Sequence, residues 1–60
     1  MIHIHLKTIY NGINDSMLEA IDLLASESVT RDEHNFWFDT DASQQEIDAV
    51  CQTFGLVRVD

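Results

Sequence analysis

The residues whose spacing is most suggestive of chemistry are two histidines near the start of the chain, His3 and His5. On a β-strand, side chains at positions i and i+2 lie on the same side, about 6 to 7 Å apart. That separation allows both imidazoles to bind one metal ion, with His34 as the remaining histidine of the chain. Such a pair is also an ordinary feature of a solvated sheet face. We therefore expect no metal and no cofactor, and we keep a metal-binding module using His3 and His5 as an alternative.

The single cysteine, Cys51, is the obvious candidate for a nucleophile, because a thiol paired with a histidine can be activated. Its neighbours argue against that role. Cys51 shares an apolar stripe with Ile47, Val50 and Phe54 at helical spacing, so we expect a buried structural thiol. The sequence has no phosphate-binding glycine loop and no serine-elbow motif. We predict no catalytic residues and no enzymatic activity.

The charge balance of the chain is strongly acidic. Three basic residues, Lys7, Arg31 and Arg58, stand against eleven acidic ones, and the net charge is -8. Phosphate backbones and anionic membranes repel such a chain. We therefore expect no direct binding to nucleic acid and no binding to membranes, and we expect a protein partner with a basic surface.

Sixty residues allow one small domain, residues 1–60. A chain of this size buries only about 60% of its unfolded surface, and so its stability is marginal. One cysteine excludes an internal disulfide. The apolar start, residues 1–6, is too short for a signal peptide or a transmembrane helix, so we expect a cytoplasmic protein.

Alternation of apolar and polar residues predicts the strands. Residues 2–9 read IHIHLKTI and predict a strand, which the pair Asn11-Gly12 then breaks. The aromatic segment 35–39 and the tail 56–59 predict two more strands. Residues 29–30 form either a short partner of the aromatic strand or no strand at all.

Apolar residues at helical spacing predict two helices. The first spans about 16–27, with Ser16 and Glu19 as a capping box. The second follows Ser43, for which Asp41 is an alternative cap, and runs to Phe54. Gly55 is then well placed for the left-handed conformation that ends a helix.

The element order is β-α-β-β-α-β, or β-α-β-α-β without the short strand. This order favours an α+β two-layer sandwich with both helices on one face of a small sheet. It resembles the ferredoxin-like sandwich, which implies that the first and third strands are central. The resemblance covers the whole chain but lies in element order alone, and this fold supports many unrelated functions.

Strand alternation then sorts the side chains into two faces. The expected core contains Ile2, Ile4, Leu6, Met17, Leu18, Ile21, Leu24, Phe36, Phe38, Ile47, Val50, Cys51, Phe54, Val57 and Val59. The expected open face of the sheet carries His3, His5, Lys7, Asn35, Trp37, Asp39 and Arg58. The expected acidic face, on the outer side of the helices, carries Glu19, Asp22, Glu27, Asp41, Glu46 and Asp48.

These faces suggest a small acidic protein-binding module. In size and charge the chain resembles inhibitors carried by phages and mobile elements, which implies an inhibitor or regulator. Its acidic face would mimic nucleic acid and engage a basic surface of a nucleic-acid-handling protein. Besides the metal-binding alternative, the open sheet face around Trp37, with His5, Lys7 and Arg58, offers an interface for a partner or for a homodimer.

Overall fold

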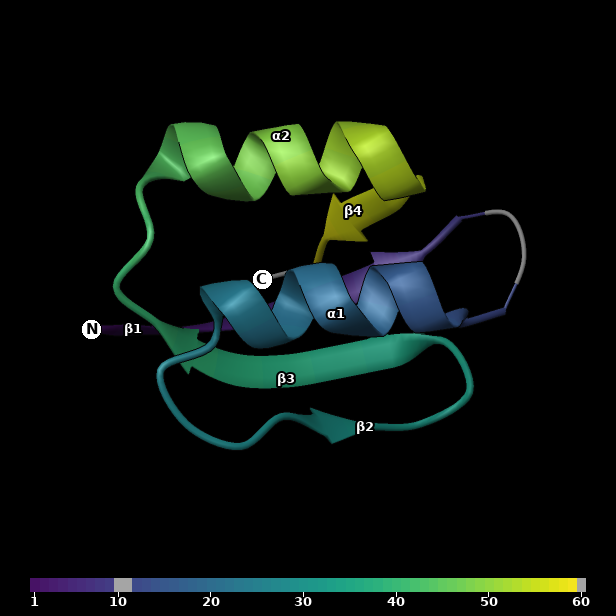
Figure 1. The fold of residues 1–60 in the computed structure, drawn as a ribbon, viewed down its shortest axis with the longest axis horizontal. Helices are drawn as coiled ribbons and strands as arrows, with labels where there is room; N and C mark the ends of the chain where they lie inside the picture. Colours follow the sequence, from purple (N-terminus) through teal and green to yellow (C-terminus); the bar gives the residue numbers. More distant parts are fainter. Residues whose placement is uncertain (10–11, 60) are drawn as a thin grey trace.

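Two helices and a four-stranded antiparallel sheet form the two layers of the chain (Figure 1). The computed structural model describes residues 1–9 and 12–59, so the predicted break at Asn11 lies outside the described residues. The elements are β1 (Ile2–Thr8), α1 (Asp15–Leu24), β2 (Thr30–Arg31), β3 (Asn35–Thr40), α2 (Gln44–Phe54) and β4 (Leu56–Arg58). The predicted α+β class is confirmed, in its six-element form.

The strand order is β2-β3-β1-β4, so β1 and β3 are the central strands, as expected. In the β1–β3 pair, Ile4 lies opposite Phe38 and Leu6 opposite Phe36. All four side chains are at most 2% exposed. Directly opposed residues of an antiparallel pair share one face, and this pairing therefore places the apolar residues of both strands under the helices.

The helices complete the core with three buried side chains, Met17 and Ile21 from α1 and Ile47 from α2. A ring of partly buried residues packs against them: Ile13, Leu18, Leu24, Ala25, Val29, Ala42, Val50, Cys51 and Phe54. The expected core is therefore confirmed in its centre. At its margin the prediction was wrong for Ile2, which lies opposite Thr40 at the end of the β1–β3 pair and is 47% exposed.

The predicted alternation of the last strand was wrong by one residue, so its inward and outward side chains are exchanged. Val57 and Val59 are 42% and 47% exposed, whereas Leu56 is 4% exposed and lies opposite Thr8. The left-handed Gly55 ends α2 at φ 68°, and the residue after it already belongs to the sheet. Leu56 therefore takes the inward position and shifts every later side chain to the other face.

The first helix also differs from its prediction at both ends. Asn14, not Ser16, is the cap, since its side-chain oxygen accepts a hydrogen bond from the Met17 amide at 2.9 Å. The helix ends at Leu24 instead of continuing to residue 27, because Ala25 is extended and forms a bridge with Thr40. For α2, the predicted Ser43 cap and the left-handed Gly55 are confirmed.

Thr40 holds the end of α1 against the end of β3. Its hydroxyl is completely buried, donates to the Leu24 carbonyl at 2.6 Å and accepts from the Ala42 amide at 3.0 Å. Beside it, the Ser26 amide donates to the Asp39 carbonyl at 2.8 Å. One threonine therefore satisfies two backbone groups that the turn would otherwise leave unpaired.

We predict that Thr40→Val lowers the free energy of unfolding by about 1 to 3 kcal/mol, because two backbone groups lose their partner in a buried position. Thr53→Val is the matched control, since the Thr53 hydroxyl is exposed and donates within α2 to the Ala49 carbonyl. Urea denaturation of both variants measures the difference. Equal midpoints for the two variants would contradict the role assigned to Thr40.

Candidate functional site

The face of the sheet away from the helices carries the aromatic side chain that was predicted there. Trp37 lies directly opposite His5, and the two rings stack with centroids 4.7 Å apart and an interplanar angle of 21°. Both side chains are partly buried. A flat, partly covered tryptophan at the centre of a sheet face is a suitable anchor for a protein contact.

Each histidine of β1 is held by a different side chain of β3. The His5 Nε2 group donates to the Asn35 side-chain oxygen at 2.8 Å, and the His3 Nδ1 group donates to the Asp39 carboxylate at 2.8 Å. His34 instead contacts the Thr8 hydroxyl at 3.2 Å. Within residues 1–9 and 12–59, no three histidine, cysteine or carboxylate side chains are grouped as metal ligands. The geometry thus gives the metal-binding alternative no support.

An apolar margin borders the stacked rings along β4. Val57 lies opposite Lys7, and the Val59 amide donates to the His5 carbonyl at 2.9 Å, so both valines lie on the face of Trp37. Ile9, 51% exposed, extends this margin beyond β1, where its amide donates to the Gly55 carbonyl. The one-residue error in the last strand had hidden this margin from sequence reasoning.

We call this surface the open sheet face. Its residues are His3, His5, Lys7, Ile9, Thr30, Asn35, Trp37, Asp39, Val57 and Val59.

Arg58 does not belong to the open sheet face, and its predicted position there was wrong. It lies opposite Leu6 and therefore on the helix side, where its guanidinium donates to the Gln44 side chain at 3.3 Å. Arg31 lies opposite Phe36, also on the helix side. Lys7 is consequently the one arginine or lysine of the described residues on the open sheet face.

The helical layer has a different character. Neither α1 nor α2 contains a lysine or arginine. The outer positions carry exposed carboxylates, and we call this set the acidic helix face: Asp15, Glu19 and Asp22 on α1, and Glu46 and Asp48 on α2. Two of the predicted residues, Glu27 and Asp41, are exposed but lie in connections, and Asp41 forms an ion pair with the terminal ammonium at 3.2 Å.

One large apolar residue is exposed within the acidic helix face. Leu23 is 88% exposed and follows Glu19 by four positions and Asp22 by one. Sequence reasoning did not assign it to either face. Its position in a helix that directs Met17 and Ile21 inward could have revealed it, because residues two positions after a core residue point away from the core.

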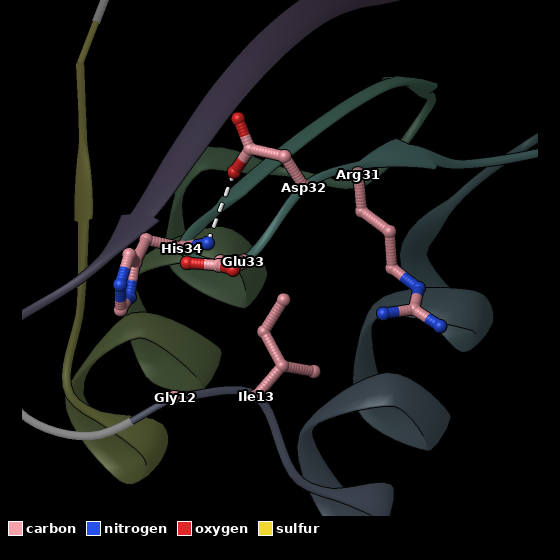
Figure 2. Close-up of a pocket in the computed structure, with 6 residues that line it drawn as sticks. All are labelled: Gly12, Ile13, Arg31, Asp32, Glu33 and His34. Carbon is pink, nitrogen blue, oxygen red and sulfur yellow. Dashed lines mark hydrogen bonds between the residues drawn. The ribbon is translucent and has the colours of Figure 1, made fainter.

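A shallow hollow lies between the β2–β3 turn and the segment before α1 (Figure 2). It is lined by Gly12, Ile13, Arg31, Asp32, Glu33 and His34. The Asp32 carboxylate accepts hydrogen bonds from the His34 amide at 3.0 Å and from Asn35 at 2.9 Å. These bonds, that from the His34 amide first, lower the pKa of Asp32 below its ordinary value. The Asp32 carboxylate therefore stabilises the turn through its Oδ1 atom.

Cys51 lines a second hollow, together with Asp48 and Arg58. Partial burial, and secondarily the nearby Asp48 carboxylate, raises the pKa of the Cys51 thiol above its ordinary value of 9.0. A thiol that stays protonated at neutral pH is a poor nucleophile. The predicted structural role of Cys51 agrees with this environment, although the side chain is only partly buried.

Comparison with known proteins finds no matching family model, no matching curated protein and no matching solved structure. Among the helices of residues 1–9 and 12–59, none has the length and apolar character needed to cross a membrane.

We predict that Cys51 reacts several-fold more slowly with iodoacetamide at pH 8 in the folded chain than in urea. The unfolded chain also loses the thiol proton at lower pH than the folded chain. The contribution of Cys51 to stability is therefore complete below about pH 9 and decreases above it. The difference in unfolding free energy between the native chain and Cys51→Ala, measured from pH 7 to 10, isolates this contribution. Equal alkylation rates would show that the thiol is as accessible and as easily ionised in the folded chain as in urea, and would contradict this prediction.

Proposed function

We propose that this chain is a small cytoplasmic protein-binding module that acts by binding and not by catalysis. Its partner is a nucleic-acid-handling protein, which it inhibits or regulates by occupying a basic surface. The observation that carries this proposal is the acidic helix face, where two adjacent helices present carboxylates and contain no lysine or arginine.

Carboxylates at the surface of a helical layer resemble the phosphates of a nucleic-acid strand in charge. A basic groove that binds phosphates would accept Glu19 and Asp22 from α1 together with Glu46 and Asp48 from α2. The net charge of -8 adds long-range attraction, which raises the association rate with a basic protein. The same charge opposes direct binding to nucleic acid.

The exposed Leu23 favours a protein partner, because it adds an apolar contact to the electrostatic ones. Leu23 lies beside Glu19 and Asp22, so a bound protein can make an apolar contact there next to the charged ones. The nucleic acid that the acidic helix face would mimic has no such aliphatic side chain. Charges attract the partner and fix its orientation, whereas buried apolar area slows its dissociation. The acidic helix face therefore combines attraction with a point of attachment.

Affinity capture from the native host, repeated at low and high salt, tests the proposal. We expect one basic, nucleic-acid-binding protein that is retained at low salt, lost at high salt and displaced by added nucleic acid. The double variant Glu19→Gln/Asp22→Asn should lose this partner, because it removes two charges from the acidic helix face.

The matched control is Glu33→Gln/Asp39→Asn, which removes two charges from the β2–β3 turn and the open sheet face. This control should retain the partner. If both double variants lose the partner to the same extent, binding depends on net charge alone and not on the acidic helix face. Capture that is insensitive to salt and to both variants would overturn the proposal.

A further inference from the structure

The open sheet face has a charge at each end and rings at its centre. Lys7 lies in the row of Asn35, and Asp39 lies in the row of His3, with the stacked His5 and Trp37 between the two rows. Asp32 lies beyond Asn35 in the row of Lys7, where its carboxylate accepts hydrogen bonds from His34 and Asn35. The two charged rows are four residues apart, about 13 Å along the strands. Within residues 1–9 and 12–59, no carboxylate forms an ion pair with the Lys7 ammonium. One Asp39 carboxylate oxygen accepts the hydrogen bond from His3, and the Asp39 side chain stays 41% exposed.

We propose that the open sheet face binds a second copy of this chain, about a two-fold axis that crosses the strands at the row of His5 and Trp37. Such an axis lies between the two sheets, and the strands of the second copy run in the opposite direction to those of the first. Lys7 of one copy is then brought over the row of His3 and Asp39 of the second copy, and the reciprocal contact forms at the other end. Lys7 of each copy thus faces the row that carries the Asp39 carboxylate of the second copy.

The same axis brings like surfaces together where they are apolar. Trp37 lies against Trp37 of the second copy. Val59, with Val57 beside it, lies against Val59 of the second copy. The acidic helix faces remain on the two outer sides, each separated from the other by both sheets. The repulsion between two chains of charge -8 is therefore weakest in this arrangement.

The size of the face defines how tightly the copies bind. Strands of seven, two, six and three residues, spaced about 4.8 Å apart, give a flat area of roughly 300 Å² per copy. Stable interfaces bury about 800 Å² per partner, so this contact belongs to the weak, reversible class. We therefore expect self-association that depends on concentration in the micromolar to millimolar range.

Analytical ultracentrifugation of two charge-reversed variants in moderate salt tests the pairing. Lys7→Asp alone and Asp39→Lys alone should remain monomeric, because each places like charges opposite each other at both contacts. An equal mixture of the two should form a heterodimer, in which both contacts again join opposite charges. The native chain should associate on its own at the same total concentration.

Two controls separate this local pairing from net charge. Arg31→Asp and Asp22→Lys change the net charge by the same amounts, but both residues lie on the helix side. Each should self-associate like the native chain, and mixing them should add nothing beyond the self-association of each. If Asp39→Lys does not fold by circular dichroism, Lys7→Gln and Asp39→Asn replace the pair and should each weaken association several-fold.

The proposal is overturned if the native chain stays monomeric up to about millimolar concentration, or if mixing the charge-reversed variants produces no heterodimer. It is also overturned if the helix-side controls weaken association as much as the sheet-face variants do. These outcomes leave the role of the acidic helix face unchanged, because that role depends on a different surface and is measured with a different partner.

Discussion

The register between β1 and β3 is the constraint on which the other features of this chain depend. Placing Ile4 opposite Phe38 and Leu6 opposite Phe36 gathers the apolar side chains of both central strands on one face. The period of a strand is two residues, and a slip of one residue would turn this face to solvent. In a core with few buried side chains, that burial is a large part of the available stabilisation.

The same register determines the chemistry of the opposite face. Because the buried residues alternate with the others, His5 is placed over Trp37, and His3 is placed beside Asp39. Cross-strand pairs of this kind each add a small stabilisation. They also hold the two histidines of β1 in separate contacts, His5 with Asn35 and His3 with Asp39. Five acidic residues lie on the two helices of the other layer.

Much of this architecture could be predicted from residue patterns. The alternation in residues 2–8 and 35–40 is strong, and the tertiary structure keeps it. The Ser43 cap and Gly55 are local signals that depend only on nearby backbone groups. The position of Trp37 opposite His5 could not be predicted in the same way, because it depends on the register of β1 and β3. The alternation of residues limits the possible registers but does not select one.

The remaining errors arose where a neighbouring residue or a distant contact overrides the pattern of a segment. The Val-x-Val tail is an equally good inward or outward strand, and the left-handed residue before it decided the phase. Ser16 has the spacing of a capping box, but Asn14 provides an earlier cap. The end of α1 was set by Thr40, sixteen residues further along the chain, whose buried hydroxyl has no signature in the sequence.

Nuclear Overhauser contacts between α-protons test the register of the central strands most directly. The Thr8 amide donates to the His34 carbonyl, so in the β1–β3 pair His5 and Trp37 face each other without mutual hydrogen bonds. The Val59 amide donates to the His5 carbonyl, so in the β1–β4 pair the same holds for Leu6 and Arg58. Opposed α-carbons are closest in such pairs, about 4.5 Å apart. We expect strong α-proton contacts for both pairs, because their α-carbons are close in this register. A contact from Leu6 to Val57 or Val59 in place of Arg58, or from His5 to Phe36 or Phe38 in place of Trp37, would contradict it.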